Sequence, residues 1–159
     1  MRVSLALTHY LKRRCLFADV PYIGADGLRR IGYGHVIRRH EDAALQQIPE
    51  PQADFLLQAD CHPIGLYLDA IQGRFAQPLT QQQFDALAAL CFRVGLKPFE
   101  TSAMPRQLRA GDIDAVSAEF ASFDWLDDHH TRHTLRRSSR HAANCAAMER
   151  EIFDNGRYA

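Results

Sequence analysis

The sequence predicts an α+β fold that is mostly helical and carries a small sheet near its N-terminus. From residue 22 to residue 37, β-branched, aromatic and glycine residues alternate, which is typical of a short irregular hairpin or three-stranded sheet. Apolar residues at spacings compatible with helices precede this segment and follow it over most of the chain. At 159 residues, 47% of them hydrophobic, the chain is long enough for a compact core and short enough for a single domain.

The N-terminal half is expected to contain a helix over 3–18, then the sheet, then a second helix over about 52–72 that links the sheet to the rest. Pro21, Gly24 and Asp26-Gly27 are strong turn signals after the first helix. Pro63 lies inside the linking helix, and because proline donates no backbone hydrogen bond we expect a kink or a break there. Residues 1–50 would form the first lobe and 73–159 a helical lobe.

The helical lobe begins with a strong local signal. Thr80 followed three residues later by Gln83 is a capping-box pattern, which predicts a helix that starts at residue 81. Gly95 supplies its end. By a resemblance to a known family that is set out below, short helices are expected between residues 101 and 120, and a C-terminal helix is expected to include Arg136, Arg137 and residues up to Phe153.

Charge and cysteine usage exclude several classes of protein. Nineteen basic residues balance nineteen acidic ones, so nothing in the overall charge favours a nucleic-acid or anionic-membrane partner. No secretory signal and no apolar run of transmembrane length are present, so neither a signal peptide nor a membrane span is expected. The four cysteines, at 15, 61, 91 and 145, are expected to be buried free thiols, with two long-range disulfides as the alternative.

The run Arg30-Ile31-Gly32-Tyr33-Gly34-His35 resembles the strand and turn that line the catalytic cleft of phage-type lysozymes. A second run, 84–95, resembles the central buried helix of that family, with Arg93 in the place of an asparagine. The resemblance covers nearly the whole chain. It implies the lysozyme-like fold and an endolysin, a muramidase of a bacteriophage or prophage that hydrolyses the N-acetylmuramic acid to N-acetylglucosamine bond of peptidoglycan without a cofactor. Such a protein would stay cytoplasmic until released, by a separate membrane-permeabilising protein, to the cell wall or periplasm.

The catalytic places of the family are altered in this sequence. Tyr10 stands where the family has a glutamate, Asp19 stands in the aspartate place, and Arg30 stands where the family has a threonine. Glycoside hydrolysis generally needs one carboxylic acid as proton donor and a second carboxylate. A phenol is a poor substitute for the acid. Asp19 is therefore the expected surviving carboxylate, and Asp26, in a lengthened loop, is a candidate replacement acid, with His9 as a weaker one.

Two hypotheses follow for the function. An active muramidase would bring a carboxyl group from Asp26 or elsewhere within reach of the sugar. An inactive lysozyme-like protein would show Arg30 paired with Asp19, and would bind a cell-wall glycan or a protein partner instead. In that case Arg30 could also bind the carboxylate of a lactyl-peptide stem.

The resemblance also implies residues with roles outside the catalytic set. The implied substrate-binding residues are Tyr33, Gly34, Arg93 and Ser102, and a structural ion pair is implied between His35 and Asp60. Gly32 and Gly34 are expected to serve tight backbone geometry in the sheet. In the segment 127–133, His129 and His133 have a spacing that suits a metal, but without a partner ligand elsewhere a solvated loop is the expected interpretation, and no metal site is predicted.

Overall fold

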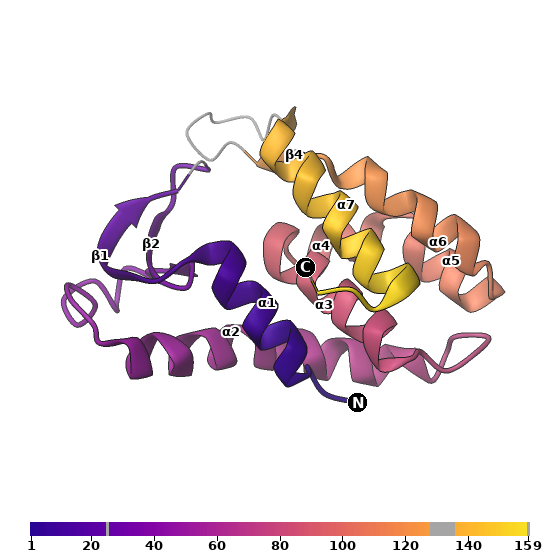
Figure 1. Ribbon diagram of the computed structural model, residues 1–159, viewed down its shortest axis with the longest axis horizontal. Coiled ribbons are helices and arrows are strands. Elements are labelled where there is room, and N and C mark those ends of the chain that lie inside the picture. The colour runs from indigo at the N-terminus through magenta and orange to yellow at the C-terminus, as the bar shows by residue number, and fades with distance from the viewer. Residues whose placement is uncertain (25, 128–135, 159) are drawn as a thin grey trace.

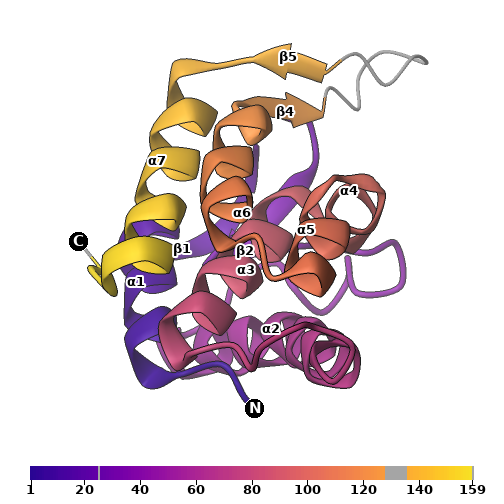
Figure 2. The same ribbon diagram turned by 90° about the vertical axis from the view of Figure 1, so that its right-hand side faces the viewer.

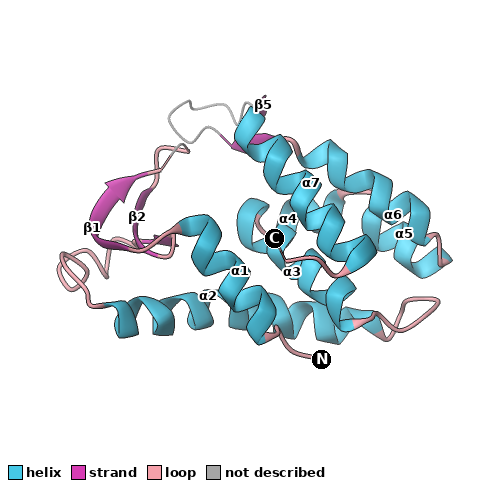
Figure 3. Cartoon of the chain, viewed as in Figure 1, coloured by secondary structure: helices cyan, strands magenta, loops and turns pink. Residues whose placement is uncertain are grey.

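The computed structural model describes residues 1–24, 26–127 and 136–158. The predicted α+β architecture is confirmed, because helices dominate and a three-stranded antiparallel sheet follows the first helix. The sheet lies at one end of the long helix α2 (Glu50–Gln72), and the remaining helices gather around its other end (Figures 1 and 3). None of the described helices is both long enough and apolar enough to span a membrane.

Helix α1 (Leu5–Cys15) is shorter than predicted. It begins after Ser4, whose Oγ accepts a hydrogen bond from the Leu7 amide at 3.1 Å, as an N-cap does. It ends before Leu16, which has a positive φ of 54° that helical backbone does not allow. The chain then enters strand β1 (Ala18–Ile23), so Asp19 lies in a strand and not on the helix.

The sheet has the order β1-β2-β3, with β2 (Arg29–Gly32) in the centre and the short β3 (His35–Val36) at the edge. In the antiparallel register Arg30 pairs with Tyr22 on one side and with Val36 on the other. The central position of β2 holds Arg30 at the middle of the sheet.

Helix α2 continues through Pro63, so the predicted break does not occur. Proline removes the hydrogen bond to the carbonyl four residues earlier, which here belongs to Ala59. Both Pro63 and Ala59 are exposed. The carbonyl that loses its helical partner is therefore on the solvent side, where it can accept a hydrogen bond from water, so no buried polar group is left unpaired.

Helix α3 (Gln81–Val94) is the centre of the core. The predicted capping box is confirmed, because the Thr80 side chain accepts from the Gln83 amide and the Gln83 side chain accepts from the Thr80 amide. Every residue from Phe84 to Cys91 is buried, so this helix is covered on all sides. Gly95, with a φ of 89°, ends it.

The rest of the helical part is a series of short elements, followed by one long helix. These are α4 (Leu96–Thr101), α5 (Met104–Ala110), α6 (Ile113–Glu119), the 3₁₀ turn η1 (Phe120–Phe123), strands β4 (Trp125–Asp127) and β5 (Arg136–Ser138), and α7 (Arg140–Asn155). Helix α7 packs on α3 and lies beside α1 (Figures 1 and 2).

The start of the C-terminal helix was predicted wrongly. Arg136 and Arg137 were expected in it, but they lie in β5, which pairs with β4 as a small antiparallel hairpin. The helix begins at Arg140, after Ser139, whose Oγ accepts from the Ala142 amide at 3.0 Å. The serine cap is a local signal for this start.

His35 joins the sheet to α2. Its Nδ1 lies 2.9 Å from Asp60 Oδ2 and its Nε2 lies 3.3 Å from Glu41 Oε2, and the side chain is buried. The hydrogen bond with Asp60 raises the pKa of His35 despite the opposing effect of burial, and Glu41 adds to the increase. The protonated imidazole therefore stabilises the folded protein.

A raised pKa gives a pH dependence of known sign. The stabilisation by His35 should be complete below the unfolded-state pKa of about 6.5 and lost as the pH rises through the higher folded-state pKa. His35→Gln should therefore lower the free energy of unfolding more at about pH 5.5 than at about pH 8.5. Urea denaturation at both pH values tests this, with His62→Gln, a change at an exposed histidine on α2, as the control. An equal loss at both pH values would assign His35 a packing role only.

Candidate functional site

A cavity of about 490 Å³ lies between α1, the sheet, the end of α3, Trp125 and α7. Its volume is within the range of small-molecule sites, which is about 300–1,000 Å³. Aromatic side chains (Tyr22, Phe92 and Trp125) share its wall with charged ones. An apolar wall with a few polar groups is the usual composition of a ligand site.

Tyr10, in the place of the family glutamate, lines this cavity and is buried. Burial, reinforced by the charge of Glu149, raises the pKa of the Tyr10 phenol. The phenol therefore stays protonated at neutral pH and can serve as a hydrogen-bond donor. It is too weak an acid to replace a carboxylic acid as a proton donor.

Arg30 also lines the cavity, but its partner is Asp26 and not Asp19. One terminal nitrogen of Arg30 donates to Asp26 Oδ2, and the other donates to the carbonyl of Gly34 at 2.7 Å. Although burial opposes ionisation of Asp26, the hydrogen bonds from Arg30 and from the Leu28 amide lower its pKa. Asp26 is thus in the cavity, but as an ionised partner of an arginine.

Asp19 lies outside the residues that line the cavity. It is exposed, its carboxylate lies 3.5 Å from Gln47 Nε2, and its backbone carbonyl accepts from the Ile48 amide at 2.9 Å. The arrangement expected for an inactive cleft, with Arg30 paired to Asp19, is therefore not found. Asp26, the residue named for an active cleft, has its carboxylate paired with Arg30, so a free carboxyl group would have to come from elsewhere.

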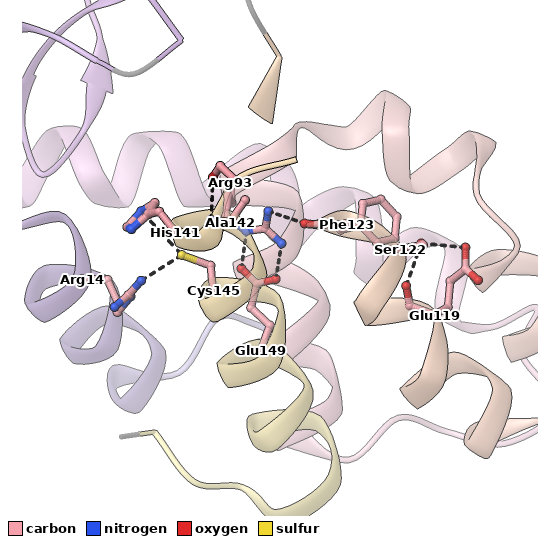
Figure 4. Close-up of polar contacts among 10 residues, drawn as sticks. Arg14, Arg93, Glu119, Ser122, Phe123, His141, Ala142, Cys145 and Glu149 are labelled. Atoms are coloured by element: carbon pink, nitrogen blue, oxygen red, sulfur yellow. Dashed lines mark hydrogen bonds and ion pairs between the residues drawn. The ribbon is translucent and has the colours of Figure 1, made fainter. Parts of the chain in front are cut away.

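Arg93 and Glu149 form a buried ion pair in the cavity wall (Figure 4). Arg93 Nε donates to Glu149 Oε1 at 2.8 Å and its terminal nitrogen donates to Oε2 at 2.7 Å, while the other terminal nitrogen donates to the Phe123 carbonyl at 2.9 Å. Burial raises the pKa of Glu149, against the opposing effect of Arg93. Each of the three Arg93 guanidinium nitrogens thus donates one hydrogen bond within the protein.

The remaining substrate-binding places differ in position. Gly34 lines the cavity, whereas Tyr33 and Ser102 do not. Tyr33 is buried, donates to Glu50 and lies beneath the ammonium group of Lys12, 4.9 Å from the ring centre. Ser102 Oγ donates to the Phe99 carbonyl at 2.7 Å, at the junction of α4 and α5. The structure therefore brings together only part of the set implied by the resemblance.

Several cavity residues were missed by the sequence analysis, namely Arg14, Trp125, His141, Cys145 and Glu149. A signal for Glu149 exists in the sequence. It lies three residues before Ile152 and four before Phe153, so it shares their buried helix face, where an unpaired carboxylate would be costly. A buried cation elsewhere was required, and Arg93, which directly follows the apolar run 86–92, was the candidate.

All four cysteines are free thiols, as predicted; Cys15 is half-buried and the others are buried. Burial raises the pKa of Cys15 to about 11 and that of Cys61 to about 12. Within residues 1–24, 26–127 and 136–158 no three histidine, cysteine or acidic side chains are grouped to hold a metal. His129 and His133 lie outside the described residues.

Comparisons with known proteins agree with this architecture. The model of the Phage lysozyme family matches residues 17–141. An endolysin of Acyrthosiphon pisum secondary endosymbiont phage 1 is 34% identical over 90 residues, which are 57% of this chain and 58% of that protein. The matched segment thus spans less than two thirds of that relative.

Solved structures match over nearly the full length. The endolysin of Escherichia coli O157:H7 phage FAHEc1 has a TM-score of 0.80 at 21% identity, covering 100% of this chain and 97% of that one. The muramidase domain of SpmX from Asticaccaulis excentricus has a TM-score of 0.75 at 24% identity, covering 97% and 98%. These similarities show the lysozyme-like fold. Because the family model matches well over half of the sequence, the chain belongs to the phage lysozyme family.

Proposed function

We propose that this protein acts on bacterial peptidoglycan by binding a glycan strand in the cavity without cleaving it. The observation that supports this most directly is the state of the carboxylates. Among the described residues, the carboxylates that line the cavity are those of Asp26 and Glu149, each is ion-paired with an arginine, and Asp19 is outside. Glycoside hydrolysis by the usual route needs a carboxylic acid and a second carboxylate that can both reach the sugar.

The chemistry of the wall supports a glycan as the ligand. Sugar rings present apolar C–H faces between hydroxyl groups, and aromatic side chains beside hydrogen-bonding ones complement both features. Tyr22 and Trp125 supply aromatic surface, and the Tyr10 phenol supplies a polar group deeper in the cavity. The matched endolysin and muramidase domain, by their names, support peptidoglycan in particular. The expected place of action is the cell wall or periplasm, after release from the cytoplasm.

A second candidate function is hydrolysis with Glu149 as the acid. The observation that favours it is the raised pKa of this buried carboxyl group in the cavity wall. A carboxylic acid with a raised pKa is the form that donates a proton to a glycosidic oxygen. For Glu149 to act in this way, its two hydrogen bonds with Arg93 would have to open.

Cosedimentation with purified sacculi, together with release of soluble muropeptides, distinguishes these functions. We expect the unaltered protein to sediment with the sacculi and to release no more muropeptide than a heat-denatured sample. Glu149→Gln and Asp26→Asn are the informative variants, with Asp114→Asn, an exposed acid on α6, as the control. Release that is lost in Glu149→Gln but kept in Asp114→Asn would establish hydrolysis. If the unaltered protein neither sediments with the sacculi nor releases muropeptides, peptidoglycan is rejected as the ligand.

A further inference from the structure

The described residues that line the cavity carry unequal numbers of opposite charges. Three of them are arginines and two carry carboxylates, Asp26 and Glu149. Arg30 is paired with Asp26 and Arg93 with Glu149. Arg14 on α1 is the arginine left over.

The contacts of Arg14 show how its charge is placed. One terminal nitrogen donates to Cys145 Sγ at 2.8 Å, and this sulfur lies 3.7 Å from His141 Nε2 (Figure 4). Across the described part of the chain, no carboxylate forms an ion pair with Arg14, which is half-buried. Helices α1 and α7 therefore bring a guanidinium, an imidazole and a thiol together at the cavity wall.

The guanidinium fork of Arg14 is only partly used within the described protein. A guanidinium carries five N–H donors in a planar fork, and the Cys145 sulfur, a weak acceptor, takes one of them. Burial disfavours the Arg14 charge, and among the described residues the contact with the Cys145 sulfur, and not a carboxylate, offsets this effect and raises the pKa of Arg14. A carboxylate would match the fork with two parallel hydrogen bonds. His141 beside it can donate a further one.

We propose that Arg14, with His141 beside it, is a carboxylate-binding subsite of the cavity. The inference rests on the proposed function, because the carboxylate would be one carried by peptidoglycan. Two sources have this chemistry: the lactyl group of muramic acid where no peptide is attached, and the free carboxylates of the stem peptide. Arg30 is not available for this role, because its terminal nitrogens donate to Asp26 and to the Gly34 carbonyl.

Titration calorimetry with three soluble glycans tests the subsite. The probes are a neutral N-acetylglucosamine tetramer, a peptide-free N-acetylglucosamine–N-acetylmuramic acid tetramer, and the same tetramer with its stem peptides. Arg14→Gln removes the charge. Arg13→Gln is the matched control, because Arg13 is the next residue on α1, is exposed, and donates to the Tyr158 carbonyl outside the cavity. Thermal unfolding of both variants establishes that they are folded.

We expect Arg14→Gln to weaken binding of at least one carboxylate-bearing glycan about tenfold or more, as loss of a charge-assisted pair does. Binding of the neutral tetramer, and all binding by Arg13→Gln, should be unchanged. A loss seen with the peptide-free acidic tetramer identifies the lactyl carboxylate, and a loss seen only with the peptide-bearing one identifies the stem peptide. Equal affinities of Arg14→Gln and the unaltered protein for both acidic glycans would overturn the subsite while leaving peptidoglycan binding intact. Failure of the unaltered protein to bind any probe or to sediment with sacculi would overturn the proposed function itself.

Discussion

Replacing Arg93 with methionine is expected to lower the free energy of unfolding by about 3–5 kcal/mol, because it leaves the Glu149 carboxylate buried without its partner. The side chains of Arg93 and Glu149 are only 11% and 3% exposed, so water cannot solvate the charge that remains. Both Glu149 oxygens accept from Arg93 in the folded protein, and both bonds are lost together. Urea denaturation near neutral pH measures the effect.

The double variant Arg93→Met/Glu149→Leu separates the charge from the packing. Replacement of a whole buried ion pair by apolar residues of similar volume is often neutral, so the double variant should recover most of the stability lost in Arg93→Met. The exposed pair of Arg157 and Glu151 provides the control, and Arg157→Met should cost no more than about 1 kcal/mol. A double variant as unstable as the single one would show that shape, and not the unpaired charge, causes the loss.

Gly32→Ala is expected to destabilise the protein by about 2–4 kcal/mol, through backbone strain added to overpacking. Gly32 has a φ of 64°, a conformation that residues with a side chain rarely adopt. A Cβ at this position would lie 2.9 Å from the Ala53 Cβ and 3.3 Å from its Cα on α2. The close approach of the sheet to α2 therefore requires a glycine here.

Gly73→Ala is the matched control for this prediction. Gly73 ends α2 with a helical φ of −62°, and a Cβ there would meet no atom within 4 Å. The substitution should be neutral or slightly stabilising, because it reduces the freedom of the unfolded chain. Chemical denaturation of both variants gives the comparison. Similar stabilities for Gly32→Ala and the unaltered protein would mean that the turn can shift away from α2.

Features set by neighbouring residues could be predicted from the sequence. The start of α3 was correct because Thr80 and Gln83 satisfy the free amides of the helix by themselves. Its end at Gly95 was correct for the same kind of reason, since a single glycine supplies the positive φ.

Features that depend on contacts between remote parts of the chain could not be predicted from the sequence. Residues 136–138 form a strand because they pair with 125–127, whereas the Ser139 cap signals only the helix that starts after them. The end of α1 was placed three residues too late, because the next segment is drawn into the sheet by its pairing with β2. The effect of Pro63 depends on which side of α2 faces solvent. That side is exposed because other helices pack against the opposite side of α2, and this packing is not visible in the sequence.

The same distinction between local and remote determinants applies to the candidate site. The sequence by itself determined the family resemblance, the phenol at Tyr10 and the arginine at Arg30, because these follow from which residue occupies which place of a motif. The tertiary structure decided which carboxylate each arginine meets. Arg30 pairs with Asp26 across a turn, and Arg93 pairs with Glu149, 56 residues away. An ion pair depends on the distance between two charged groups, and for residues on different elements only the packing of those elements determines that distance.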